Sequence, residues 1–157
     1  MKLYLLRHGD AAANAPSDAE RPLTRRGEGE VLEIAQRCTD RLKQVAQVVS
    51  SPYLRARQTA AILTRTLSDV SGYQGELLIN PLITPAGQLD EVGAFVGALE
   101  SEEVLLVTHQ PLVGYLLNYL TDSDAHGGMT TANLAALELS AFTRGGAKLL
   151  WLERPTH

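Results

Sequence analysis

The segment Lys2-Leu3-Tyr4-Leu5-Leu6-Arg7-His8-Gly9 places a short apolar run directly before a charged residue, a titratable residue and a glycine. A continuous apolar run of this length is typical of a strand that is buried on both faces, as in parallel sheets. The stretch from Gly9 to Pro22 is rich in Gly, Ala, Asn, Pro, Ser and Asp, and it predicts a loop. The side chains of Arg7 and His8 are therefore expected where a buried strand ends.

The rest of the chain continues this alternation of strands with helices. Further strands are predicted at Val45–Val49, Glu76–Ile79, Val104–Val107, Leu134–Leu139 and Lys148–Leu152. Helices are predicted from the capping residue Thr24 to Leu42, from Ser51-Pro52 (N-cap and first residue) through Leu67, over Leu89–Leu99, and from Gln110-Pro111 through Leu120. Arg144-Gly145-Gly146 is typical of a hairpin turn between the last two strands. The pattern predicts a single α/β domain over residues 1–157, a three-layer sandwich with a mostly parallel sheet flanked by helices.

Polar residues follow three of the predicted strands, at the edge where an α/β sheet binds its ligand. Arg7, His8 and Gly9 directly follow the first strand. Arg55 lies in the first turn of the helix after the second strand, and His109 follows the fourth strand. Helix N-termini at this edge offer free N–H groups to an anion, and arginine binds phosphate through two parallel hydrogen bonds. We interpret the cluster as a phosphate site held by Arg7 and Arg55, in which one histidine attacks phosphorus and Gly9 lets the backbone approach closely.

Each of these residues also has an ordinary structural explanation when it is taken alone. The tripeptide Arg7-His8-Gly9 occurs by chance in unrelated chains, His109 suits a core or capping position, and Arg55 suits a solvated helix surface. Their coincidence at one sheet edge is what favours a site. His8 and Asp10 could begin a metal site, but no third or fourth ligand has suitable spacing, so no metal is expected.

The charge balance limits the classes of partner. The 157 residues include 14 Lys or Arg and 18 Asp or Glu, for a net charge of −4, and no Lys or Arg lies between Thr66 and Thr143. An acidic chain without a basic run is a poor general ligand for nucleic acid or for anionic membranes. No apolar stretch approaches the ~20 residues of a membrane span, and the N-terminus has no signal-peptide pattern, so we expect a cytoplasmic protein.

The single cysteine and two of the histidines also have ordinary explanations. Cys38 cannot form an internal disulfide and falls on the apolar stripe of a predicted helix, so we expect a small buried hydrophobic residue. His126, in a Gly-rich loop, and His157, at the C-terminus, are expected to be exposed to solvent.

Three motifs resemble those of the histidine phosphatase superfamily, which includes the cofactor-dependent phosphoglycerate mutases. They are Leu6-Arg7-His8-Gly9, Ser51-Pro52-Tyr53-Leu54-Arg55-Ala56-Arg57-Gln58-Thr59 and Val107-Thr108-His109. The match is best with the short SixA-type phosphohistidine phosphatases, through Arg7-His8-Gly9-Asp10-Ala11, Arg21-Pro22-Leu23-Thr24, Leu82-Ile83-Thr84-Pro85 and the segment from His109 to Leu116. The resemblance implies a phosphoglycerate mutase-like fold and phosphatase activity.

The resemblance also implies roles for individual residues. His8 would be the nucleophile, phosphorylated on nitrogen during turnover, and Arg7, Arg55 and His109 would form the phosphate pocket. The backbone N–H of Gln110 would join this pocket. No metal or other cofactor is implied, because arginine and histidine supply the charge that a metal would bring.

Two further residues are candidates for substrate binding. Arg21 adds a cation from the same half of the chain. Asn14 stands six residues after the histidine, where many larger relatives carry a pocket asparagine, and it keeps open a small phosphomonoester as the substrate.

The larger relatives also carry an acid after the third strand that protonates an alcohol leaving group, whereas residues 81–87 here contain none. An alkoxide is a very poor leaving group, since even water has a pKa of about 15.7. The conjugate acid of imidazole has a pKa of about 6.5, so phosphohistidine can lose its phosphoryl group with little help. The missing acid therefore favours P–N cleavage, although Asp10, Asp18, Asp90 and Glu91 remain possible replacements.

We therefore expect a monomeric phosphohistidine phosphatase whose partner is a histidine-phosphorylated signalling or phosphocarrier protein. The chain lacks the long insertions that enclose a small-metabolite pocket in the mutases, which favours a protein-borne substrate. A phosphatase of small phosphomonoesters with the same fold is the alternative. A non-catalytic module that binds phosphorylated partners is disfavoured, because both histidines and both arginines are present.

Overall fold

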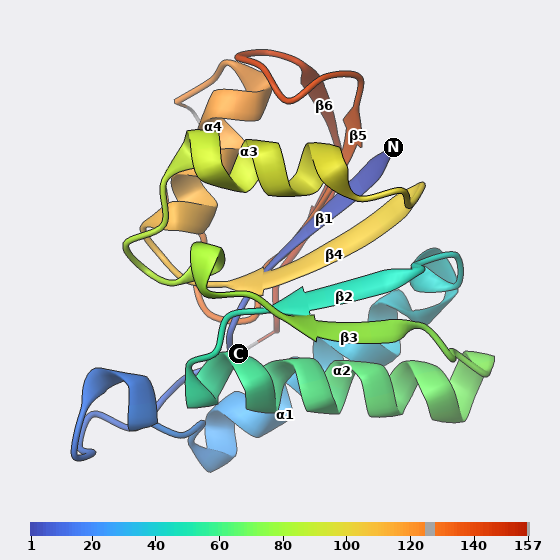
Figure 1. Ribbon diagram of the computed structural model, residues 1–157. Coiled ribbons are helices and arrows are strands. Elements are labelled where there is room, and N and C mark those ends of the chain that lie inside the picture. The colour runs from blue at the N-terminus through green and yellow to red at the C-terminus, as the bar shows by residue number, and fades with distance from the viewer. Residues whose placement is uncertain (125–127, 157) are drawn as a thin grey trace.

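The computed structural model describes residues 1–124 and 128–156, which form one sheet covered by helices on both faces (Figure 1). Within these residues the strands are β1 (Lys2–Arg7), β2 (Gln47–Ser50), β3 (Glu76–Ile79), β4 (Glu103–Thr108), β5 (Leu134–Leu139) and β6 (Ala147–Glu153). The α-helices are α1 (Arg25–Cys38), α2 (Leu54–Ser71), α3 (Leu89–Ala98) and α4 (Leu112–Thr121). No helix in these two ranges is long and apolar enough to cross a membrane.

The strands are arranged in the order β3-β2-β4-β1-β5-β6. Strands β3, β2, β4 and β1 run parallel to one another, and the hairpin of β5 and β6 adds β5 antiparallel to β1. The prediction of a three-layer α/β fold with a mostly parallel sheet is confirmed. Because the strands are parallel, the C-terminal ends of β1, β2 and β4 lie at one edge, where the candidate site residues follow them.

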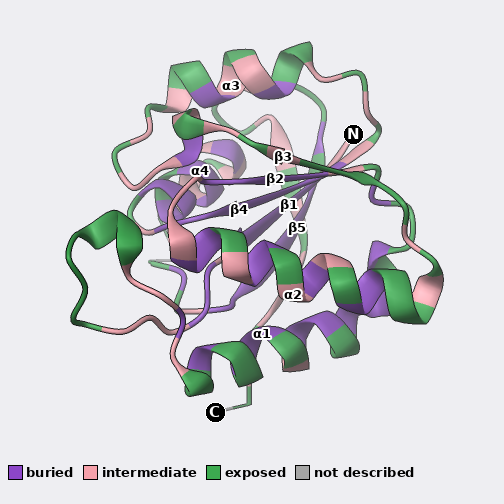
Figure 2. Cartoon of the chain, turned by 60° about the horizontal axis from the view of Figure 1, so that its bottom comes forward, coloured by how far each residue is buried: buried purple, intermediate pink, exposed green. Residues whose placement is uncertain are grey.

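The central strands are buried on both faces, which explains their unbroken apolar sequences. In β1, Tyr4 and Leu6 belong to the core cluster with α1 and α2, whereas Leu3 and Leu5 belong to the cluster with α3 and α4. Successive side chains alternate because they point to opposite faces of a strand. The helices α1 and α2 are buried on one face only. Figure 2 shows their purple buried stripes toward the sheet and their green exposed stripes away from it.

The start of α2 differs from the prediction. The helix begins at Leu54 with Tyr53 as its N-cap, so the assignment of Ser51 and Pro52 as N-cap and first helical residue is wrong. The Oγ of Ser51 instead accepts a hydrogen bond from the backbone N–H of Tyr53, at 3.2 Å, and the chain turns once more before the helix begins. By contrast, Thr24 caps α1 as predicted.

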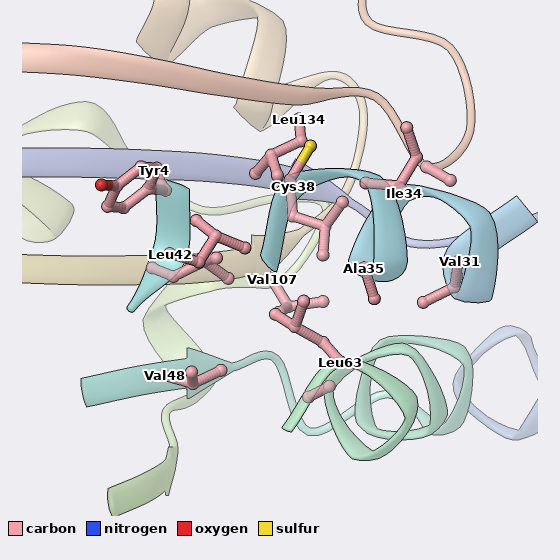
Figure 3. Packing of buried hydrophobic residues seen from close by; sticks show 14 of the residues in the cluster. Tyr4, Val31, Ile34, Ala35, Cys38, Leu42, Val48, Leu63, Val107 and Leu134 are labelled. Atoms are coloured by element: carbon pink, nitrogen blue, oxygen red, sulfur yellow. The ribbon is translucent and has the colours of Figure 1, made fainter. Parts of the chain in front are cut away.

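Cys38 is the last residue of α1 and is fully buried, which confirms the expectation from its place on the apolar stripe (Figure 3). It lies in one cluster with Ile34 and Leu134, and burial raises the pKa of its thiol. The helix predicted to reach Leu42 continues beyond Cys38 as a 3-10 helix, Thr39–Leu42. Cys38 therefore contributes packing rather than reactivity.

The loop that follows β1 runs against α1 so closely that two glycines are required. A Cβ on Gly27 would lie 2.1 Å from the carbonyl oxygen of Asp10, and a Cβ on Gly9 would lie 2.6 Å from the carbonyl oxygen of Gly27. The backbone N–H of Asp10 also donates to Oε1 of the buried Glu30, at 2.9 Å. These contacts hold the chain directly after His8 against the first turns of α1.

We predict that Gly27→Ala lowers the free energy of unfolding by about 1–3 kcal/mol, because the added Cβ overlaps backbone atoms that cannot rotate away. Gly29→Ala is the matched control on the same helix, since a Cβ there meets nothing within 4 Å. Alanine at that exposed helical position raises the free energy of unfolding by about 0.5–1 kcal/mol. Urea denaturation of both variants measures the difference, and equal stabilities would contradict the close approach of loop and helix.

Candidate active site

The parallel pairing of β1 with β4 brings the two candidate histidines together. Arg7 is the register partner of Thr108, and the backbone N–H of His8 donates to the carbonyl oxygen of Thr108 at 3.1 Å. The rings of His8 and His109 therefore lie next to each other, with their centroids 5.1 Å apart. Both side chains are buried, with exposed fractions of 5% and 1%.

The two ring nitrogens of His8 have different partners. Nδ1 lies 2.7 Å from the carbonyl oxygen of Gly9, and because a carbonyl only accepts, Nδ1 carries the ring proton. Nε2 then holds a lone pair, and it accepts a hydrogen bond from Nε–H of Arg55 at 3.3 Å. Nε2 is therefore the nucleophilic nitrogen of this ring.

Arg55 lies in the first turn of α2 and is almost fully buried. Its Nη1 donates to the carbonyl oxygen of Asp18 at 2.6 Å, and its Nη2 donates to the Oδ2 carboxylate oxygen of Asp18 at 3.2 Å. The other carboxylate oxygen of Asp18 accepts from Nη1 of Arg21 at 2.9 Å. Hydrogen bonds from Arg21 and then Arg55 hold the pKa of Asp18 below its usual range, so this carboxylate is ionised beside the histidine.

The ring of His109 is held between two residues that follow β2. Its Nε2 lies 2.7 Å from Oγ of Ser51, and the ring of Tyr53 meets it edge-on, with centroids 5.1 Å apart. Its Nδ1 is buried and has no hydrogen-bond partner within residues 1–124 and 128–156. Buried polar atoms in this condition are uncommon in folded proteins, and they are suited to recognising a bound group.

Arg7 contributes a third guanidinium group from the end of β1. Its Nη1 donates to the carbonyl oxygen of Met129 at 2.9 Å, while its buried Nε has no partner in the described part of the chain. Burial and the charge of Arg55 lower the pKa of this side chain. Three arginines therefore surround His8, and positive charge of this density favours a bound anion.

Gly9 was expected to let the backbone approach a bound phosphate, and the structure shows that it lets the backbone approach α1. Its backbone N–H donates to Oγ1 of Thr59 at 3.1 Å, and Oγ1 of Thr59 donates to the carbonyl oxygen of Arg55 at 2.8 Å. The space that a side chain would fill is taken by Gly27 of α1. The close approach that glycine permits is therefore to α1, and the same residue links the loop to α2.

The remaining predicted substrate-binding residues divide into two groups. Arg21 joins the cluster through Asp18, and its Nε donates to the carbonyl oxygen of Ala12 at 2.6 Å. Oε1 of Gln110 accepts from the backbone N–H of Met129 at 3.3 Å, which ties the start of α4 to the same loop that Arg7 contacts. Asn14 is exposed, and among the described residues no hydrogen bond joins it to the cluster, so its role in substrate binding stays a prediction.

Of the four acids considered as proton donors, Asp18 is the one that reaches the cluster in the described part of the chain. Oδ2 of Asp10 accepts from Oγ1 of Thr24 at 2.7 Å, which places Asp10 in the cap of α1. Asp90 and Glu91 are exposed in the first turn of α3, and no hydrogen bond or ion pair joins them to the histidines across residues 1–124 and 128–156.

Burial and positive charge keep both histidines neutral. The pKa of His8 is lowered to about 4, mainly by burial and then by the charges of Arg55 and Arg7. The pKa of His109 is lowered to about 3 by burial, by its neighbour His8 and by Arg55. At neutral pH each ring therefore carries a single proton, and one nitrogen of each ring has a lone pair.

No group of three or more His, Cys, Asp or Glu side chains is placed to bind a metal ion within the described ranges. His126 and His157 lie outside those ranges, so their exposure stays a prediction.

Two residues of the cluster were not predicted from the sequence. Ser51 was assigned to a helix cap, although Ser50 pairs with Val107 in the sheet, and this register carries Ser51 toward His109. Asp18 was considered only as a proton donor, and its contact with Arg55 depends on the path of a loop that no periodic pattern describes.

Comparisons with known proteins agree with this geometry. Residues 3–75 match the family model of the histidine phosphatase superfamily (branch 1). The chain is 34% identical over 148 residues to phosphohistidine phosphatase SixA of Escherichia coli (strain K12), which covers 92% of this chain and 89% of that protein. It is 30% identical over 125 residues to the phosphohistidine phosphatase SixA homolog of Haemophilus influenzae, covering 74% of this chain and 75% of the other.

Solved structures show the same relationship. The protein histidine phosphatase SixA complexed with tungstate superposes with a TM-score of 0.83 at 32% identity, covering 99% of this chain and 97% of that one. A mycobacterial glucosyl-3-phosphoglycerate phosphatase superposes with a TM-score of 0.70 at 18% identity, covering 96% and 97% of the two chains. Because its sequence identity is only 18%, the similarity to the second structure supports the fold alone.

We predict that His8 stays neutral, with its proton on Nδ1, at about pH 5.5, where an unperturbed imidazole is mostly charged. Because its pKa is lowered to about 4, protonation begins only as the pH falls well below 6.5. Long-range ¹H–¹⁵N spectra recorded from neutral to acidic pH follow the two ring nitrogens, and a His8→Gln variant identifies their signals. A His8 ring that titrates near its ordinary value would contradict the burial and charge described above.

Proposed function

The chain belongs to the histidine phosphatase superfamily, and we propose that it hydrolyses phosphohistidine on a signalling or phosphocarrier protein. Two similar proteins, from Escherichia coli and Haemophilus influenzae, are named phosphohistidine phosphatase SixA and its homolog, which supports this substrate class. The observation that carries the proposal is the ring of His8, whose Nε2 holds a lone pair beside the guanidinium groups of Arg7 and Arg55.

In the first step, Nε2 of His8 attacks phosphorus and forms a P–N bond to the enzyme. The P–N bond to the substrate histidine breaks, and its electron pair stays with the substrate imidazole, which leaves as the neutral ring when its other nitrogen is protonated. The hydrogen bond from Nδ1 to the carbonyl oxygen of Gly9 supports this attack, because it stabilises the positive charge that develops on the ring.

The residues around Nε2 are suited to the charge on the transferred group. Arg55 and Arg7 provide N–H donors and fixed positive charge for the phosphoryl oxygens, and His109 adds its unpartnered Nδ1. The structure of the SixA relative complexed with tungstate supports this proposal, since tungstate is a tetrahedral oxyanion like phosphate. These residues supply the positive charge, and on this basis we propose that the reaction requires no metal ion.

In the second step, a water oxygen attacks the phosphorus of phosphorylated His8. The new P–O bond forms as the P–Nε2 bond breaks, and the electron pair returns to Nε2, which regenerates the neutral ring. Inorganic phosphate leaves, and the proton lost by the attacking water passes to the phosphate or to solvent.

The ionisation of Asp18 favours phosphohistidine over an ester as the substrate. Hydrolysis of an alkyl ester needs a protonated acid at the leaving oxygen, since an alkoxide is too basic to leave alone. Asp18 is the carboxyl group that reaches the cluster within the described residues, and its two arginine partners keep it ionised. An imidazole leaving group does not need such an acid.

We predict that the purified protein dephosphorylates a histidine-phosphorylated carrier protein at least about 10²-fold faster, by kcat/KM, than sugar or nucleotide phosphomonoesters. General acid catalysis contributes about 10²–10⁴-fold, and the ester reaction lacks it here. Phosphate release from each substrate is measured with and without EDTA, which should have no effect.

His8→Ala is the control for this experiment, and it should remove both phosphate release and any acid-labile phosphoenzyme. Faster turnover of an ester than of the phosphorylated carrier would instead favour a small-molecule phosphatase. Full activity of His8→Ala would show that the nucleophile is another residue.

We also predict that Arg55→Lys lowers kcat/KM by about 10²–10³-fold, because lysine keeps the charge but loses the planar set of donors. Arg65→Lys is the matched control, since Arg65 is exposed further along the same helix, away from the histidines. Activity within a few-fold of wild type in Arg55→Lys would contradict a directional role for this guanidinium.

A further inference from the structure

Ser51 makes a contact that the proposed reaction has not yet used. It is fully buried directly after β2, and its Oγ lies 2.7 Å from Nε2 of His109. Its backbone is fixed, since its N–H donates to the carbonyl oxygen of Val107 at 3.0 Å. The hydroxyl is thus held on the side of the His109 ring opposite to the unpartnered Nδ1.

The direction of the proton between Ser51 and His109 follows from the other contacts of the hydroxyl. Oγ already accepts a hydrogen bond from the backbone N–H of Tyr53, at 3.2 Å. If Nε2 of His109 also donated to Oγ, the hydroxyl proton would need another acceptor, and the described residues provide none at Oγ. An unpaired donor in a fully buried position costs about 1–3 kcal/mol. With Oγ–H of Ser51 donating to Nε2, one buried group stays unpaired among the described residues, the N–H at Nδ1 of His109, whereas the reverse arrangement leaves two, the hydroxyl proton and the lone pair at Nδ1. The first arrangement is therefore favoured.

The proton of a neutral His109 ring must then lie on Nδ1. Burial, His8 and Arg55 keep this ring neutral, so it has one proton to place. With Nε2 occupied as an acceptor, Nδ1–H becomes a buried donor without a partner in residues 1–124 and 128–156. A donor of this kind can bind a phosphoryl oxygen, whereas the other tautomer would present a lone pair that repels it.

We infer that Ser51 is a positioning residue that holds His109 in the Nδ1–H tautomer and so makes it a hydrogen-bond donor to the transferred phosphoryl group. This inference rests on the proposed function, because it assigns the donor an anionic partner. Tyr53 supports the same arrangement from two sides, through its backbone N–H to Ser51 and its ring edge-on to His109.

The test uses Ser51→Ala, with Ser50→Ala as the matched control. Ser50 is equally buried, but its Oγ donates to the carbonyl oxygen of Ser51 at 2.8 Å. Long-range ¹H–¹⁵N spectra of the free protein report the tautomer of His109, and kcat/KM and inhibition by tungstate report anion binding. A Ser51→Cys variant, which keeps a weak donor, provides the same readouts if Ser51→Ala does not fold.

We expect the wild type and Ser50→Ala to show a protonated Nδ1 and an acceptor Nε2 in His109. In Ser51→Ala the Nε2–H tautomer should become populated, kcat/KM should fall about 10-fold, and tungstate should inhibit correspondingly less. An intermediate effect is expected for Ser51→Cys.

A protonated Nε2 in the wild type, or an unchanged tautomer and activity in Ser51→Ala, would overturn this inference. Neither result would contradict the proposed function, because that proposal depends on His8. Conversely, if the wild type hydrolysed no phosphohistidine, the proposed function would fail, while the spectra of the free protein would still decide the tautomer.

Discussion

The parallel register of β1 with β4 is the constraint on which the site depends. It sets Arg7 opposite Thr108, so the residues that follow, His8 and His109, meet at the sheet edge with their rings 5.1 Å apart. The pairing of β2 with β4 brings Ser51 to His109 in the same way. A slip of one residue in either pair would turn buried side chains to the opposite face and separate the histidines. The pairing register of the strands therefore fixes the chemistry as well as the core.

Charge is the second organising feature of the site. The chain is acidic overall, with a net charge of −4, yet Arg7, Arg21 and Arg55 gather around His8. Their charge has three linked effects: it adds to burial in lowering the pKa of His8, which keeps that ring neutral, it keeps Asp18 ionised, and it favours an anion. The overall charge still argues against general binding of polyanions, but not against a phosphorylated substrate, because a phosphoryl group meets the local field of the pocket. Asp18 accepts from both Nη atoms of Arg55, from Nη1 through its backbone carbonyl oxygen and from Nη2 through its carboxylate, so a phosphoryl oxygen at Nη2 must share or replace this carboxylate.

The sequence allowed the strands, the parallel sheet and the convergence of Arg7, His8, Arg55 and His109 to be predicted. These depend on local patterns, since apolar runs mark strands and site residues follow strand ends. The start of α2 was predicted two residues too early, because Ser51-Pro52 satisfies the local rule for a cap while its hydroxyl is engaged by His109. The contacts of Asp18 were not predictable, because an irregular loop has no periodicity. Asn14 rests on the resemblance to larger relatives, and its exposed position in the same irregular loop leaves its role in substrate binding a prediction.

The central claim is that Nε2 of His8 forms the bond to phosphorus, because Nδ1 donates to the carbonyl oxygen of Gly9. The most direct test is to trap the phosphoenzyme during turnover of a phosphorylated carrier by rapid quenching in base, and to locate the phosphoryl group by tandem mass spectrometry and ¹⁵N–³¹P correlation. The account predicts one phosphoryl group, on Nε2 of His8. A phosphoryl group on Nδ1 of His8, one on His109, or turnover without any phosphoenzyme would contradict it.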